Sequence, residues 1–339
     1  MKPLEGLIAK AGLVVASVAV SLLVFEGALR LLDYRYTPLR IETINTWSEW
    51  RYYHAFDDAQ FVYDPELLWR PRKGSGFFNE QGYRGKLLTE AKQPGSVRVF
   101  AIGDSNTLGW SGVGGPQWPA YLEQLFNQNG QNVTVTNAGV YGYTSFQGLR
   151  HFKETLKFAP DIVLVSFGAN DAMHVTMSDA EFANRKVRSL DWDKALMRTR
   201  TGQMVLNGLD NLSNQDTKHP VPRVALEEYK ANLNEIIRFS AARQISVVLL
   251  TRPFTGTSPS LLWWKNFAPQ YNVATLELAD RTGVPAVDVY SFFKGCTDCF
   301  VDESHFTEKG MRLMAELLYE KVHEDVEARL TSTLSRTLQ

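Results

Sequence analysis

Cysteine is scarce in this chain, with only two residues, Cys296 and Cys299, among 339. One Cys-x-x-Cys pair cannot by itself supply the four ligands of a structural zinc site. A disulfide that closes a four-residue loop is the simpler interpretation, and it would place the domain in an oxidising compartment outside the cytoplasm. A thioredoxin-like redox role is the alternative, but no strand leads directly into the pair at the opening of a helix, as that chemistry requires.

Excess charge is absent as well, since the net charge is −1 and no long basic run occurs. Nothing therefore favours a phosphate-backbone partner, and nucleic acid is excluded as a ligand. Internal repeats and low-complexity tracts are also missing. Hydrophobic residues make up 44% of the chain, which is enough to bury one substantial core.

The single long apolar run lies at the N-terminus, where residues 11–25 carry no charge. This run spans roughly 22 Å as a helix, and continuing it through Leu32 gives about 33 Å, enough to cross a bilayer with some tilt. Glu26 and Arg30 then lie one turn apart and can pair near the interface. We predict a retained transmembrane anchor over residues 1–33. A cleaved signal peptide is the alternative, although no small-x-small cleavage site follows the apolar core.

The remaining chain divides by its pattern into two parts. Residues 34–95 are rich in aromatics but lack a helical period, which predicts an irregular membrane-proximal region. From residue 96 to about 330, short apolar runs alternate with helical stretches. The expected strands are 97–102, 133–136, 162–167, 245–251 and 284–289, and the expected helices are 118–129, 146–158, 226–243, 266–282 and 309–322.

Strands separated by helices imply right-handed crossovers and a parallel sheet covered on both faces. The fold class is therefore α/β, a doubly wound domain with a five-stranded parallel sheet. Residues 173–223 are polar and do not fit the alternation, so we interpret them as an insertion. It is either a lid near the carboxyl ends of the strands or a solvated excursion without substrate contact.

Three candidate site residues follow the ends of predicted strands. Ser105, in Gly-Asp-Ser, comes directly after the first strand, which places its hydroxyl at the carboxyl edge of the sheet. Gly139 follows the second strand and Asn170 the third. A side-chain amide at this edge can stabilise a developing oxyanion, although Asn170 is equally suited to cap the next helix. A turn also favours Gly, Asp and Ser, so the Gly-Asp-Ser block indicates a nucleophile only in combination with the other motifs.

The base must be a histidine, and Asp-x-x-His occurs three times, ending at His174, His219 and His305. Only His305 follows the fifth strand and precedes the last helix, so only its position converges with Ser105. Asp302 can orient its imidazole, leaving the other nitrogen to take the serine proton. His174 and His219 are expected to be surface or lid residues.

Residues 97 to about 322 resemble the SGNH (GDSL-like) hydrolase family in four ordered blocks. These are Gly-Asp-Ser with Ser105, Asn-x-Gly with Gly139, Gly-x-Asn-Asp with Asn170, and Asp-x-x-His with Asp302 and His305. Residues 64–71 and 79–84 also resemble the leader of membrane-attached bacterial members. The resemblance implies a three-layer α/β/α sandwich with a flavodoxin-like sheet, and ester hydrolysis without metal or other cofactor. It assigns Ser105 as nucleophile, Asp302 and His305 as its partners, and Asp104 as a supporting residue. The implied oxyanion hole consists of the N–H groups of Ser105 and Gly139 and the Asn170 amide. Asn106 replaces the leucine that often follows the serine, which weakens any inference of a lipid substrate.

We therefore expect a serine esterase outside the cytoplasm, on the periplasmic or extracellular side, acting on acyl esters of envelope glycans, acetyl esters among them. An O-acyltransferase that passes the acyl group to a glycan, with a membrane acyl-donor protein as partner, would use the same residues. A non-catalytic glycan-binding or scaffold protein is the third alternative, but it would be expected to lack the nucleophile or the base. Trp110, Trp263 and Trp264 are candidate sugar platforms, although aromatics more often form core.

Overall fold

The computed structural model describes residues 2–35, 60–64, 66–109, 115–175, 178–184, 196, 198–213, 221–255 and 262–337. The chain forms two compact units. The helical unit consists of residues 1–43 and 184–219, and the sheet unit consists of residues 44–183 and 220–339. Each is described separately below.

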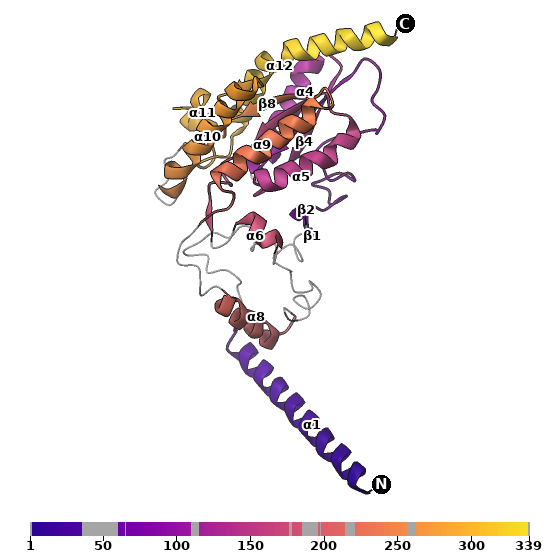
Figure 1. Ribbon diagram of the computed structural model, residues 1–339, viewed down its shortest axis with the longest axis vertical. Helices are drawn as coiled ribbons and strands as arrows, with labels where there is room; N and C mark the ends of the chain where they lie inside the picture. The colour runs from indigo at the N-terminus through magenta and orange to yellow at the C-terminus, as the bar shows by residue number, and fades with distance from the viewer. Residues whose placement is uncertain are drawn as a thin grey trace. The chain divides into compact units, whose positions relative to one another are not determined.

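A five-stranded parallel sheet forms the centre of the sheet unit (Figure 1). Its strands run in the order β4-β3-β5-β8-β9. They are β3 (Val97–Gly103), β4 (Val133–Gly139), β5 (Ile162–Ser166), β8 (Ser246–Leu250) and β9 (Ala286–Val287). Every residue of β3 and β5 is buried, because helices cover both faces of a parallel sheet and leave no solvated side. The predicted fold class and the five predicted strands are confirmed.

Helices cover the sheet in two layers (Figure 1). On one face, α4 (Trp118–Gln128) and α12 (Glu308–Thr337) share a hydrophobic core with side chains of the central strands. The other face is covered by α5 (Ser145–Thr155), α9 (Leu226–Ala241) and α10 (Leu262–Thr282). This unit also contains the short helices α3 (Ser105–Leu108) and α11 (Val289–Phe292) and the 3-10 turns at Leu156–Phe158 and Thr297–Cys299.

The segment before β3 contains an ordered hairpin where the sequence predicted irregular structure. Strands β1 (Phe61–Asp64) and β2 (Leu68–Pro71) pair antiparallel. Trp69 is fully buried, and its indole N–H donates to the Tyr141 carbonyl at 3.0 Å. In return the Tyr143 hydroxyl donates to the Trp69 carbonyl at 2.7 Å. The hairpin is therefore fixed by contacts with residues more than 70 positions away, which no local period reveals.

The insertion divides between the two units. Its ends form a stem in the sheet unit, where β6 (His174–Val175) pairs antiparallel with β7 (Val221–Pro222) and α6 (Asp179–Asn184) follows. Its middle contributes α8 (Arg200–Ser213) to the helical unit, together with the N-terminal helix α1 (Lys2–Leu31).

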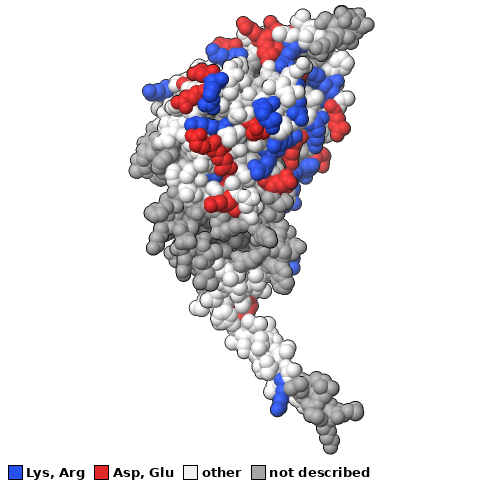
Figure 2. Space-filling view, viewed as in Figure 1, with Lys and Arg blue, Asp and Glu red and all other residues white. Residues whose placement is uncertain are grey.

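Within α1, the segment Lys10–Leu31 is long and apolar enough to cross a membrane, a criterion that anchors and signal sequences both meet. Few charged side chains are visible along the part of this segment that is not grey in Figure 2.

Candidate active site

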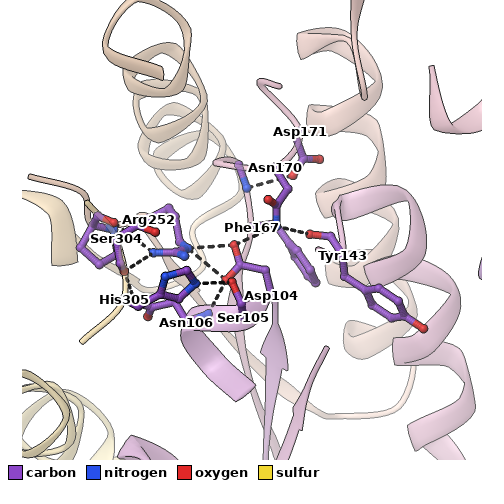
Figure 3. A network of polar contacts seen from close by, with 12 residues as sticks. Asp104, Ser105, Asn106, Tyr143, Phe167, Asn170, Asp171, Arg252, Ser304 and His305 are labelled. Atoms are coloured by element: carbon purple, nitrogen blue, oxygen red, sulfur yellow. Dashed lines mark hydrogen bonds and ion pairs between the residues drawn. The ribbon is translucent and has the colours of Figure 1, made fainter. Parts of the chain in front are cut away.

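Ser105 and His305 meet at the carboxyl edge of the sheet (Figure 3). The Ser105 Oγ lies 2.7 Å from His305 Nε2, and His305 Nδ1 lies 2.7 Å from Asp302 Oδ2. Because Nδ1 faces a carboxylate it carries the ring proton, so Nε2 is the nitrogen that accepts from the serine hydroxyl. Of the other two histidines in Asp-x-x-His motifs, His174 lies in β6 with Nδ1 3.1 Å from the Ala172 carbonyl, and His219 lies outside the described residues.

Asp302 is held as an ionised acceptor. Its Oδ1 accepts the backbone N–H groups of Ser304 and His305, each at 2.8 Å, and its Oδ2 accepts from the imidazole. Burial opposes ionisation, but the hydrogen bonds from the His305 ring and the two backbone groups outweigh it and lower the pKa of Asp302 to about 2. The carboxylate is therefore charged at neutral pH and able to stabilise an imidazolium.

The loop that carries Asp302 and His305 is closed on itself. An isolated antiparallel bridge pairs Phe300 with Phe306, and the Val301 N–H donates to the His305 carbonyl at 2.9 Å. Just before it, Cys296 and Cys299 form the predicted disulfide. These contacts fix the imidazole position between η4 (Thr297–Cys299) and α12.

A buried ion pair between Asp104 and Arg252 connects this loop to the nucleophile turn. The sequence analysis identified Asp104 but not Arg252. Asp104 caps α3 by accepting from Asn106 N at 2.8 Å, and its Oδ2 lies 2.9 Å from Arg252 Nε, both side chains being at most 2% exposed. Arg252 Nη1 also donates to the Ser304 carbonyl at 3.2 Å, beside the Asn106 amide at 2.6 Å (Figure 3). The sequence feature that could have identified Arg252 is its position directly after a predicted apolar strand, at the edge where Ser105 also lies.

Asn170 lies on the same rim as Asp104, next to the loop that follows β4. Its Nδ2 donates to the Tyr143 carbonyl at 3.0 Å and makes a longer contact of 3.4 Å with Asp104 Oδ2 (Figure 3). The neighbouring Asp171 is fully buried, which raises its pKa to about 7 although it accepts the N–H groups of Ser145 and Gly168. Asp171 thereby fastens the end of β5 to the start of α5.

Gly139, the last residue of β4, and Gly142, three residues after it, have different environments. The Gly139 N–H donates to Asn137 Oδ1 at 3.0 Å, and a Cβ on this residue would overlap the backbone nitrogen of Leu108 in α3. Gly142 is buried with φ of 70°, and within the described ranges its N–H has no acceptor. Gly139 is therefore needed for close packing of α3, and its N–H is already bonded.

A second buried ion pair holds the Gly142 loop. Arg223 Nη1 donates to the Gly142 carbonyl at 2.8 Å, and Arg223 Nη2 lies 2.9 Å from Asp179 Oδ2, with both side chains 0% exposed. Asp179 also accepts from the hydroxyl of Thr144, the residue that caps α5, at 2.8 Å. The stem of the insertion is thus bonded directly to the loop that carries Gly142 and Tyr143.

The candidate sugar platforms are not placed by the structure. Trp110 lies outside the described residues. Trp263 and Trp264 lie in the first turn of α10, and the structure does not describe their side chains.

A Ser-His-Asp relay at the carboxyl edge of a three-layer α/β/α sandwich is the arrangement of a serine hydrolase. Residues 101–313 match the model of the GDSL-like lipase/acylhydrolase family, and the chain belongs to this family. An arylesterase of Vibrio mimicus is 34% identical over 87 residues, which are 25% of this chain and 43% of that protein. The chain thus matches less than half of the length of that relative.

Solved structures give further matches. A lipase/acylhydrolase from Enterococcus faecalis is 20% identical with a TM-score of 0.47, covering 67% of this chain and 95% of that chain. A catalytic mutant of an acetylxylan esterase from Geobacillus stearothermophilus is 18% identical with a TM-score of 0.44, covering 67% of this chain and 94% of that chain.

Proposed function

We propose that the protein is a carboxylic-ester hydrolase in which Ser105 is the nucleophile, His305 its base and Asp302 the residue that orients the imidazole. The observation that carries the proposal is the relay of two 2.7 Å contacts from Ser105 through His305 to Asp302. Membership of the acylhydrolase family and the arylesterase match support it.

The relay supports a two-step reaction. Ser105 Oγ attacks the ester carbonyl while its proton moves to His305 Nε2, and Asp302 stabilises the resulting imidazolium. Collapse of the tetrahedral intermediate breaks the ester bond, and the departing alcohol takes the proton from Nε2. Water then attacks the acyl-serine with the same base, releasing the carboxylic acid and restoring Ser105.

The oxyanion donors are proposed from the same rim. Ser105 is the first residue of α3, so its N–H has no partner within the helix. The Asn170 amide is the side-chain donor, because one of its N–H groups makes only the longer contact of 3.4 Å with Asp104. The sequence suggested Gly139 as the third donor, but its N–H is bonded to Asn137. We infer that Gly142 takes this role, because its N–H has no acceptor among the described residues and it precedes Tyr143, whose carbonyl holds Asn170.

The proposed substrates are acyl esters of envelope glycans, acetyl esters among them, on the outer side of the membrane. The apolar segment of α1 supports a tether beside the membrane, and the Cys296–Cys299 disulfide supports an oxidising compartment. An O-acyltransferase with a membrane acyl donor would use the same residues. Measuring how an acetyl donor partitions between water and a glycan acceptor separates the two, and transfer faster than hydrolysis would favour the transferase.

The test of hydrolysis is turnover of nitrophenyl esters of several acyl lengths by the full chain. Ser105→Ala should abolish it, whereas Ser291→Ala, in the short helix α11, should leave it unchanged. Absence of turnover at every acyl length, or equal turnover in Ser105→Ala, would favour a non-catalytic scaffold instead.

A further inference from the structure

Helix α8 of the insertion is bonded to the C-terminal end of α1 in the helical unit (Figure 1). The Glu26 carboxylate of α1 accepts the backbone N–H groups of Arg200 at 3.0 Å and Thr201 at 2.8 Å, and the Thr201 hydroxyl at 2.9 Å. The first N–H groups of a helix lack intrahelical acceptors, and the helix dipole favours a negative charge there. A residue of α1 therefore caps α8 across 174 positions of sequence.

A second contact fixes the direction of α8. The amide of Asn207, in the middle of α8, donates to the hydroxyl of Tyr34, which follows α1, at 3.0 Å. Leu206 of α8 and Leu29 of α1 are both buried. With its start held by Glu26 and its middle held by Tyr34, α8 presents a defined outer face.

That outer face is apolar. The exposed residues of its described part are Met204, Val205, Gly208 and Leu209, none of them charged. A helix that faces water on one side normally carries polar residues there. Two exposed arginines lie near the N-terminal end of α8: Arg198 just before it, and Arg30 of α1, which pairs with Glu26. Apolar residues flanked by basic ones are typical of helices that lie in a membrane interface.

The position of Glu26 in α1 explains why its carboxylate requires the hydrogen bonds from α8. The charge-free stretch before it, residues 11–25, spans roughly 22 Å, which is less than the ~30 Å hydrocarbon core of a bilayer. Glu26 then lies at the edge of the apolar region, where an unpaired carboxylate is costly. Arg30, at 2.8 Å, and the start of α8 both satisfy it.

We propose that α8 is a membrane-interface helix that is docked through Glu26 on a retained α1 and places Met204, Val205 and Leu209 in the lipid surface. Because α8 docks on a helix whose own side chains are apolar and exposed, lipid is the occupant that suits both helices. Arg30 and Arg198 lie where they can contact lipid phosphates. The proposal extends the membrane tether described above and is independent of the ester chemistry.

Spin labels on the full chain test the lipid contact. Because both native cysteines are in a disulfide, single cysteines in Val205→Cys and Leu209→Cys can be labelled selectively, with Glu316→Cys on the exposed side of α12 as control. In vesicles of phosphatidylcholine and phosphatidylglycerol, oxygen should relax the labels at 205 and 209 more than a water-soluble nickel complex does, and the reverse should hold at 316. Nickel accessibility at 205 and 209 equal to that at 316 overturns the proposal.

The Glu26 cap is tested in the same vesicles. Glu26→Ala should accelerate tryptic cleavage after Arg200 several-fold, and Glu26→Gln, which keeps one acceptor oxygen, should accelerate it less. Unchanged cleavage in Glu26→Ala, or an intact mass that lacks residues 1–33, contradicts the proposal. Nitrophenyl ester turnover, measured alongside, reports on the esterase separately.

Discussion

At the scale of single residues, the site depends on two buried ion pairs that touch no substrate atom in the proposed reaction. Asp104–Arg252 and Asp179–Arg223 each hold a carbonyl of a site loop, at Ser304 and Gly142. A buried pair adds little stability compared with apolar residues of similar volume, but removing one partner leaves a buried charge. Their contribution is therefore geometric, since each fixes the loop that carries an essential group.

Replacing Arg252 tests this interpretation. Arg252→Met leaves Asp104 buried without its partner and should lower the free energy of unfolding by ~3–5 kcal/mol. The kcat for a nitrophenyl ester should also fall, because the loop with His305 loses its link to Asp104. Urea unfolding of this variant and of Arg238→Met, an exposed arginine paired with Glu235, gives the comparison. Equal losses in the two variants would refute a geometric role for Arg252.

Asp302 should affect both catalysis and acid stability. Asp302→Asn favours the wrong imidazole tautomer and should lower kcat by roughly 10⁴-fold. The folded-state pKa of Asp302 is about 2, below its unfolded value of 3.8, so its stabilising effect is present above pH ~4 and is lost as the pH falls towards 2. Solvent screens this partly exposed carboxylate, and we expect its effect to be about 1 kcal/mol.

Urea unfolding at pH 6 and at pH 2.5 measures the second effect. Wild type should exceed Asp302→Asn in stability at the higher pH, and most of the difference should vanish at the lower one. A difference that grows as the pH falls would have the wrong sign for a carboxylate with a lowered pKa.

At the scale of elements, the loop between β4 and α5 is where most site contacts converge. It supplies the Tyr143 carbonyl to Asn170, the Gly142 carbonyl to Arg223 and the Thr144 hydroxyl to Asp179. At its start, Gly139 lets α3 approach the end of β4. This loop therefore sets the distance between the nucleophile turn and the proposed oxyanion donors.

The two glycines of this loop should respond differently to alanine. Gly139→Ala places a Cβ against the backbone of α3 and should displace Ser105, lowering both stability and kcat. Gly142→Ala retains the N–H and adds only the cost of a left-handed residue, ~1–2 kcal/mol. Kinetics and thermal unfolding of both variants measure these effects. A wild-type kcat in Gly139→Ala would contradict the role of Gly139 in packing α3.

At the scale of the whole molecule, the sequence predicted the sheet because strands buried on both faces are continuous apolar runs, as β3 and β5 are. It also selected His305 among three similar motifs, because the order of strands fixes which loops share an edge. Arg252 and the β1–β2 hairpin were not predicted, since their partners lie 148 and more than 70 residues away. Gly139 ends β4 and Gly142 lies in the loop after it, and only the hydrogen bonds of the folded backbone distinguish their N–H groups.

The disulfide should contribute modestly to the whole fold. The Cys296→Ser, Cys299→Ser double variant removes a bridge across four residues and should lose ~2 kcal/mol of unfolding free energy. Ester turnover should persist, because backbone hydrogen bonds such as Thr307 N to Cys299 O still hold the loop. Loss of turnover in a variant that remains folded would show that the bridge itself positions His305.

The most direct test of the central claim is the site of covalent labelling by a fluorophosphonate, located by mass spectrometry on the full chain. The account predicts a single label on Ser105, formed slowly in His305→Ala and absent in Ser105→Ala. A label on another residue, or a rate of labelling that does not depend on His305, would contradict it.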